Sequence, residues 1–258
     1  MSVLSQPARL LALAMFAVGL LVLSYGPARA DGYGDCVALV EIDADAAFDA
    51  ATAWRDLGGG EPARHCAALA LVGLELYAEA AERFEALALD MTTAPSDVRA
   101  RVLAQGGQAR IAAQDYPGAV ATLSAALELA PDDAELFVDR AQALAGAANY
   151  FPAIDDLDQA IELVPGHIDA RVFRATAYRM VDAPELARKD LDVALAAEPG
   201  HIDALLERGN LRRLQGDALG ARADWLAILL HAPDGPAADA ARLNLEQLDL
   251  NPEVVQTP

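Results

Sequence analysis

The segment PGHIDA occurs twice in this chain, at residues 165–170 and again at residues 199–204. A 34-residue interval separates the two copies, and the same interval separates four prolines: Pro131, Pro165, Pro199 and Pro233. Proline lacks the N–H group that continues a helical hydrogen-bond ladder, so it is common just beyond the end of a helix. The spacing therefore predicts a repeating unit of this length that closes with a helix followed by proline.

Further columns with the same period indicate what each unit contains. Two columns hold mainly alanine, one holds bulky apolar residues, and one holds small residues only. In that order they are Ala119, Ala153, Ala187 and Ala221 with Ala126, Ala160, Ala194 and Ile228; Leu123, Leu157, Leu191 and Trp225; and Gly107, Ala141, Ala175 and Gly209. Because small residues let two helices approach closely, we expect two short helices in each unit. One pair cannot bury its apolar stripe alone, so neighbouring units must stack.

This pattern resembles the tetratricopeptide repeat (TPR) family, whose units have this same length and consist of two helices. The resemblance implies an all-α fold: a right-handed superhelical solenoid of helix-turn-helix repeats. Four units keep strict register, at 100–133, 134–167, 168–201 and 202–235. A less regular unit occupies 61–94, and five extra residues, Pro95 to Arg99, separate it from the strict array.

Two short segments flank the five units. Residues 31–60 contain one amphipathic helix, Ala44 to Leu57, which we expect to cap the first unit. Residues 236–248 should form a helix that covers the last apolar surface of the array. The tail, 249–258, has little to pack against and is expected to fray.

Residues 1–30 are typical of a cleaved export signal. Arg9 gives a positive start, Leu10 to Tyr25 is uncharged and largely apolar, and Ala28-Arg29-Ala30 matches a small-x-small cleavage site. We expect a chain that begins at Asp31, is soluble after cleavage and resides in a bacterial periplasm. The alternative is an uncleaved N-terminal anchor.

The two cysteines of the chain, Cys36 and Cys66, both follow this signal and would meet an oxidising compartment. Two cysteines allow only one intramolecular pairing, so we expect a Cys36–Cys66 disulfide. No CxxC motif is present, which favours a structural bond over a thiol-exchange centre.

Charge and motifs restrict the classes of function. The formal net charge is −20, and removal of a signal with two arginines and no acid would leave −22, which argues against nucleic acid or anionic membrane as a partner. No GxSxG, HExxH, P-loop or GxGxxG motif is present. His167 and His201 occupy equivalent sites one repeat apart, about 10 Å by helix-packing distances, too far apart to share one metal ion. We expect no catalysis, no cofactor and no metal.

A ladder of charges follows the same period. The arginines are Arg140, Arg174, Arg208 and Arg242, and the acids are Asp156, Asp190 and Asp224. One interpretation is a basic ladder that binds an acidic partner. The matching period of both signs favours the other interpretation, in which each arginine pairs with an aspartate on a neighbouring second helix and fixes the stacking.

The TPR resemblance also implies a binding surface, a concave groove lined by the first helix of each unit. We expect an apolar band, a polar band suited to a peptide backbone, and a basic end able to grip a carboxylate. The bands are Val138, Val172 and Leu206; Gln108, Gln142, Thr176 and Asn210; and Arg179 with Arg213. The implied function is a non-catalytic protein–protein interaction module, a scaffold or adaptor that binds a peptide segment or helix. The alternative is a carrier or enzyme accessory that binds a small ligand in the groove.

Overall fold

Thirteen α-helices follow one another over residues 32–250, the part of the chain that the computed structural model describes. The expected export signal and residues 251–258 of the expected tail lie outside this part. The helices are α1 (Gly32–Ile42), α2 (Ala44–Asp56), α3 (Gly60–Gly73), α4 (Tyr77–Asp90), α5 (Ser96–Ala112), α6 (Tyr116–Leu129), α7 (Ala134–Gly146), α8 (Tyr150–Leu163), α9 (Ile168–Met180), α10 (Pro184–Ala197), α11 (Ile202–Leu214), α12 (Ala218–His231) and α13 (Pro236–Leu250). No helix within 32–250 is long and apolar enough to cross a membrane.

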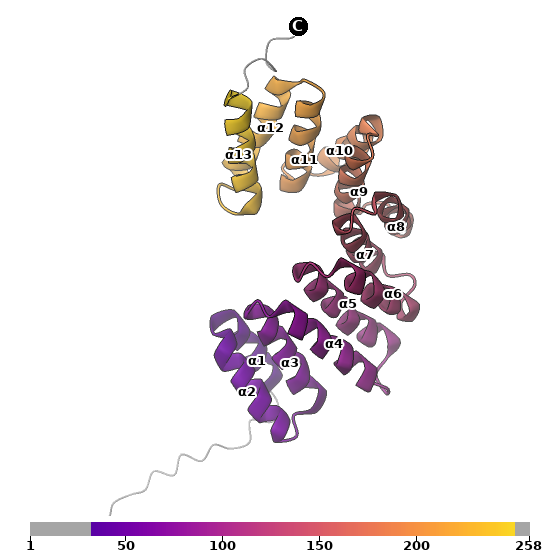
Figure 1. Cartoon of the computed structure of the whole chain (residues 1–258), viewed down its shortest axis with the longest axis vertical. Helices are drawn as coiled ribbons and strands as arrows, with labels where there is room; N and C mark the ends of the chain where they lie inside the picture. Colours follow the sequence, from indigo (N-terminus) through magenta and orange to yellow (C-terminus); the bar gives the residue numbers. More distant parts are fainter. Residues whose placement is uncertain (1–31, 251–258) are drawn as a thin grey trace, which may run out of the picture.

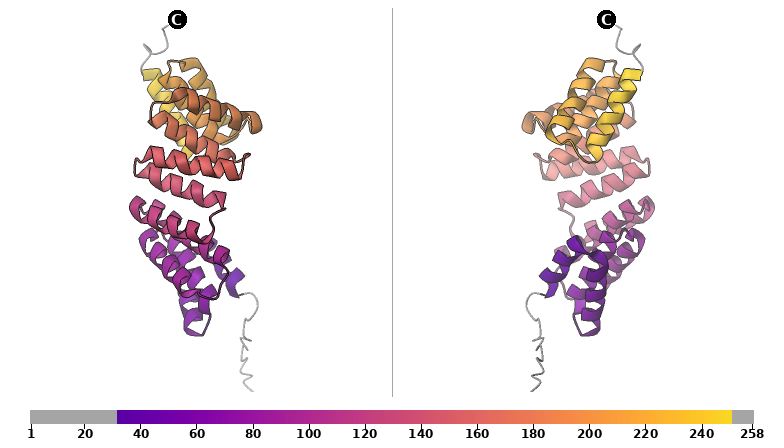
Figure 2. Two further views of the ribbon diagram at one scale, coloured as in Figure 1. Left: turned by 90° about the vertical axis from the view of Figure 1, so that its right-hand side faces the viewer. Right: turned by 90° about the vertical axis from the view of Figure 1, so that its left-hand side faces the viewer.

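The helices pack in consecutive pairs, and the pairs stack into an arc (Figures 1 and 2). The first helices of successive pairs contact one another, α5 with α7, α7 with α9, and α9 with α11. In Figure 1 α5 and α7 lie on the inner side of the arc, and α6 and α8 lie on its outer side. The fold is thus an all-α solenoid of helix-turn-helix repeats, and its concave side is formed by the first helices.

The columns of the 34-residue period form the core of this solenoid. The bulky column, Leu123, Leu157, Leu191 and Trp225, is at most 1% exposed, and the alanines that flank it are fully buried. The small column lies against the bulky one. A Cβ atom on Gly107 would lie 2.5 Å from Cγ of Leu123, so the two helices of that repeat approach too closely for a side chain there.

The turn between the two helices of each unit adopts a left-handed backbone conformation. Gln114, Ala148 and Asp182, each one period after the last, have φ values of 58–60°, and Gly216 follows at the same position with 84°. The N–H of Asn149 donates to the carbonyl oxygen of Leu144 at 2.8 Å across one such turn. This bond satisfies a carbonyl group at the end of α7 and reverses the chain into α8.

The charge ladder holds the two helices of a repeat together. Arg140 donates to both carboxylate oxygens of Asp156 at 2.8 and 2.7 Å, and Arg208 donates to Asp224 at 3.0 and 2.7 Å. Arg174 donates to Asp190 within its repeat and at 2.6 Å to Asp158 of the preceding repeat. Asp156, Asp190 and Asp224 are buried, which supports the structural interpretation of the ladder.

Arg242 departs from the ladder. It pairs with Asp239 at 2.7 Å, three residues earlier on the same helix, and with the carbonyl oxygen of Pro233. The reason is that Arg242 lies on α13, which has no second helix after it within the described residues.

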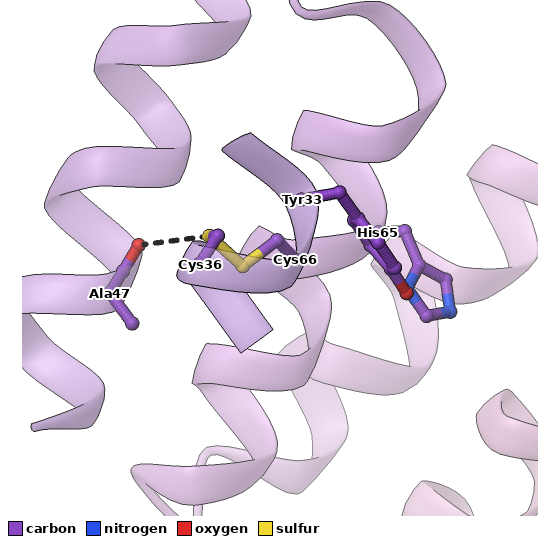
Figure 3. The surroundings of a disulfide bond; sticks show 5 residues. All are labelled: Tyr33, Cys36, Ala47, His65 and Cys66. Carbon is purple, nitrogen blue, oxygen red and sulfur yellow. Dashed lines mark hydrogen bonds between the residues drawn. A yellow bond between two sulfur atoms is a disulfide. The ribbon is translucent and has the colours of Figure 1, made fainter. Parts of the chain in front are cut away.

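The N-terminal segment contains two helices, where the sequence predicted one. Besides α2, which matches the expected helix, α1 packs against both α2 and α3. The sequence pattern missed α1 because its apolar residues, 36–40, are consecutive and show no helical spacing. The disulfide between Cys36 and Cys66 joins α1 to α3, with Cα atoms 6.3 Å apart (Figure 3).

Candidate functional site

A cavity of about 750 Å³ opens on the concave side of the solenoid, where α3, α5 and α7 come together beside the start of α1. We call it the N-terminal groove. Its lining residues are Tyr33, Glu61, Pro62, His65, Leu87, Met91, Val98, Arg101, Val102, Ala104, Gln105, Gln108, Asp133, Glu135, Leu136 and Asp139.

The groove opens where the sequence interrupts its own register. α5 has 17 residues, whereas α7, α9 and α11 have 13 each. The additional turn comprises residues 96–99, part of the five-residue insertion between the first unit and the strict array. Val98 on this turn lines the groove, and Val102 one turn further on lines it as well. The insertion therefore supplies part of the apolar wall.

His65 links three elements at one end of the groove. Its Nδ1 lies 2.8 Å from the hydroxyl of Tyr33 on α1, and its Nε2 lies 2.7 Å from Oε1 of Gln105 on α5. With that oxygen as the acceptor, Nε2 donates and Nδ1 accepts from the tyrosine. Figure 3 shows Tyr33 and His65 side by side, next to the disulfide that fixes α1. Burial raises the pKa of the Tyr33 phenol above its ordinary value, which is itself well above neutral pH, so the hydroxyl is protonated and can donate.

Asp139 lies at the other end of the groove, on α7. Gln108 of α5 donates to its Oδ2 at 3.0 Å. Burial, opposed by the bond from Gln108 and reinforced by the charges of Glu135 and Asp133, raises the pKa of Asp139 to about 6. The carboxylate is therefore ionised at neutral pH but held in an unfavourable environment.

Charge in the groove is predominantly negative over an apolar floor. Four acids line it, and the one arginine among the lining residues, Arg101, donates to Asp97 at 2.9 Å. The floor consists of Leu87, Met91, Val98, Val102 and Leu136. Such a surface suits a ligand that combines apolar groups with positive charge.

The apolar band predicted from the sequence is largely part of the core. Val138 and Val172 are 3% and 4% exposed and pack among the buried columns, so their predicted place on the binding surface is wrong. Leu206 is half-buried against the same core. The reason is that these residues pack in clusters that include both the partner helix and the next repeat.

The polar band divides between separate places. Gln108 is exposed and lines the N-terminal groove, while Gln142 and Thr176 line a separate cavity of only about 50 Å³ between α7, α8 and α9. The Thr176 hydroxyl donates to the carbonyl oxygen of Val172 at 3.1 Å. Asn210 accepts from Asn244 on α13, one period later, at 3.0 Å, so this pair joins the last repeat to the final helix.

One of the two arginines of the predicted basic end is engaged within the protein. Arg179 donates to both carboxylate oxygens of Glu207, a side chain that is itself buried. Arg213 is half-buried, and its Nε is covered without a hydrogen-bond partner among residues 32–250. Arg179 could therefore bind the carboxylate of a ligand only by releasing Glu207, which would leave a buried carboxylate without its cation.

The two repeated histidines cap helices. His167 Nδ1 accepts from the N–H of Ala170 at 3.3 Å, and His201 does the same for Ala204. Their Nε2 atoms lie 3.1 Å from Glu135 and 3.0 Å from Asp169, at the start of the preceding first helix. Within 32–250 no three His, Cys, Asp or Glu side chains are grouped closely enough to hold a metal ion.

Sequence reasoning missed several polar residues of the groove, among them Tyr33, His65, Gln105 and Asp139. Gln105 and Asp139 share one repeat position, which continues as Phe173 and Glu207, so the period could have identified this column. Tyr33 and His65 had no such signal, because they belong to the irregular N-terminal elements.

The sequence matches no protein-family model and no curated protein. Solved structures do resemble it. YrrB, described as a TPR protein with an unusual peptide-binding site, is 23% identical, with a TM-score of 0.53 over 68% of this chain and 89% of YrrB. TTC0263, a thermophilic TPR protein of Thermus thermophilus, is 17% identical, with a TM-score of 0.60 over 74% of this chain and 100% of its own.

A third structure, MamA (41-end) from Desulfovibrio magneticus RS-1, is 17% identical, with a TM-score of 0.54 over 66% of this chain and 97% of its own. At such identities the likeness concerns the fold. Together with the 34-residue period and the paired helices, it shows that this chain has the fold of the tetratricopeptide repeat proteins.

Proposed function

We propose that this protein is a non-catalytic interaction module that binds an extended peptide segment or a helix of another protein in the N-terminal groove. The observation that carries the proposal is the groove itself, a cavity of about 750 Å³ on the concave side. The TPR fold supports it, since concave surfaces of stacked repeats are extended binding surfaces.

The chemistry of the groove supports a peptide as the ligand. The apolar floor would bury side chains of the ligand and exclude water from the contact. Gln105 and Gln108 stand beside that floor, and amide groups can both donate to and accept from a peptide backbone of any sequence.

Two features support a non-catalytic role. Among the described residues, the groove lining includes no serine, threonine or cysteine that could act as a nucleophile. His65, the one histidine of this lining, has both ring nitrogens engaged, by Tyr33 and by Gln105. Neither of these partners is a carboxylate, the group that orients the catalytic histidine in a Ser-His-Asp triad.

We also propose that the protein works in the periplasm after removal of residues 1–30. The sequence of the signal supports this location, and so does the pairing of Cys36 with Cys66, because structural disulfides persist in oxidising compartments. N-terminal sequencing of the mature protein tests the proposal. A chain that begins at Asp31 is expected, and retention of Met1 or Ser2 would contradict it.

A second candidate function, a carrier of a small ligand, is favoured by one observation. The cavity volume of about 750 Å³ falls within the range of roughly 300–1,000 Å³ typical of small-molecule sites. In native mass spectrometry of the protein purified from its own cells, a carrier would retain a bound small molecule. A peptide-binding module would show the mass of the chain alone.

Selection of peptides from a phage-displayed 12-residue library tests the proposed function. Gln108→Trp fills the groove from an exposed position, and Gln159→Trp adds the same bulk to an exposed position on α8. We expect selected peptides to lose at least about tenfold in affinity toward Gln108→Trp and less than twofold toward Gln159→Trp. Equal binding to both variants would show that peptides bind elsewhere.

A further inference from the structure

We propose that the N-terminal groove selects peptides with a lysine or arginine side chain, which pairs with the carboxylate of Asp139. This inference rests on the proposed function and adds the chemistry of the ligand. Its basis is a contrast between two repeats of the same protein.

Asp139 occupies a position that recurs every 34 residues, and at one of these positions the protein itself supplies an arginine to neutralise the carboxylate. Two repeats later the column holds Glu207, and Arg179, 28 residues before it, donates to both of its oxygens. The residue 28 positions before Asp139 is Ile111. The position that supplies the internal cation to Glu207 therefore holds an apolar side chain here, and Ile111 packs against the core instead.

The groups that face Asp139 do not supply a cation instead. On α7 and its N-cap these are Glu135 and Asp133, and on α5 they are Gln108 and Arg101. Arg101 pairs with Asp97, and the His167 ring beyond Glu135 lies 3.1 Å from that glutamate. The lining of α3 and α1 adds Glu61, His65 and Tyr33. Among the described residues, Asp139 has no ion-pair partner.

A half-buried carboxylate without a cation destabilises the free protein, and the raised pKa of Asp139 reflects that cost. An ammonium or guanidinium group from a ligand would take the place that Arg179 takes at Glu207. The aliphatic stem of lysine or arginine would lie on the apolar floor beside it. Charge and shape of the groove thus favour the same ligand side chain.

The test compares peptides selected from the 12-residue phage library on four forms of the protein. Asp139→Asn removes the carboxylate and keeps an acceptor for Gln108. Asp155→Asn makes the same change of charge on the exposed face of α8. Ile111→Arg places the missing internal cation where Arg179 stands two repeats later. Thermal unfolding confirms that each variant folds before it is used.

We expect lysine or arginine to be enriched in peptides selected on the wild type and on Asp155→Asn, and not on Asp139→Asn or Ile111→Arg. In the tightest peptide, replacing the basic residue by N-acetyl-lysine should weaken binding to the wild type about tenfold at pH 7.5. The same replacement should change binding to Asp139→Asn less than twofold. At pH 5, where Asp139 is largely protonated, the wild type should respond about as Asp139→Asn does.

The outcomes separate this inference from the function on which it rests. Peptides that Gln108→Trp displaces but that carry no basic residue would overturn the inference and leave the proposed function standing. Basic peptides that bind Asp139→Asn and Asp155→Asn equally would show attraction by net charge alone and would also overturn it. Peptides that Gln108→Trp does not displace would contradict both.

Discussion

Gly209 on α11 lies directly against Trp225 on α12: a Cβ atom on residue 209 would be 2.4 Å from Nε1 of the indole. Trp225 is fully buried, so it has little room to move. We expect Gly209→Ala to lower the free energy of unfolding by about 1–3 kcal/mol, the usual cost of overpacking a core. Chemical denaturation followed by circular dichroism measures this loss.

The neighbouring repeats indicate how the damage should be repaired. At the same two positions they hold Ala141 with Leu157 and Ala175 with Leu191. Trp225→Leu should therefore cost at least about 1 kcal/mol less in the Gly209→Ala protein than in the wild type, because the double variant restores the pair of its neighbours. Strictly additive losses would contradict the direct contact.

Ala148 should be replaceable by glycine with a gain in stability. Its φ of 60° lies in the left-handed region, which costs a residue with a Cβ atom roughly 1–2 kcal/mol. Gly216 already occupies the equivalent position two repeats later. We expect Ala148→Gly to raise the free energy of unfolding by about 0.5–1 kcal/mol. This gain is smaller than the strain that is relieved, because glycine loses more chain entropy on folding. Ala147→Gly, at a φ of −81°, is the control and should destabilise.

Arg174→Ala should lower the free energy of unfolding by about 1–3 kcal/mol, because Asp190, which is 3% exposed, loses its bidentate partner. Partner binding should stay unchanged. Arg242→Ala removes an exposed member of the same sequence column and should cost less than about 0.5 kcal/mol. Equal unfolding midpoints for Arg174→Ala and wild type, together with lost binding, would reverse the structural interpretation of the ladder.

Asp139 should make the protein less stable as the pH rises from about 4 to about 6. Its folded pKa of about 6 lies above the ordinary value near 4, so in this range the folded state binds more protons than the unfolded state. The lost stability should be about 1–2 kcal/mol, allowing for partial solvent screening. The difference in unfolding free energy between wild type and Asp139→Asn, measured from pH 4 to 8, isolates this effect. A flat difference would contradict the raised pKa.

Reduction of the Cys36–Cys66 bond should loosen α1. The bond closes a loop of 30 residues, worth roughly 3.5 kcal/mol by the chain-entropy relation. We expect hydrogen exchange in α1 to rise in the Cys36→Ser, Cys66→Ser double variant, while α9 to α12 stay protected.

Thiol labelling of the denatured, unreduced protein should find no free cysteine, and full labelling of both cysteines would contradict the Cys36–Cys66 bond.

The sequence by itself determined the repeating architecture. A fixed period places the same side chains at the same point of every helix pair. The buried columns, and ion pairs such as Arg140 with Asp156, could therefore be predicted from the spacing of residues in the sequence. Even the irregular first unit could be aligned by its spacing. Local physics suffices here because each repeat contacts mainly its neighbours.

The candidate site depended on the tertiary structure. Whether a first-helix residue faces the groove or the partner helix is decided by how the pairs stack, which buried Val138 and turned Gln108 toward Asp139. Arg179 was removed from the surface by Glu207, 28 residues away, through a contact that no spacing rule predicted. The groove itself arises where α1, held by a disulfide, and the extended α5 break the period. The period of the sequence determines the residues that recur in every repeat. Which side chains line the groove depends on how the non-repeating elements, α1 and the start of α5, pack against the array.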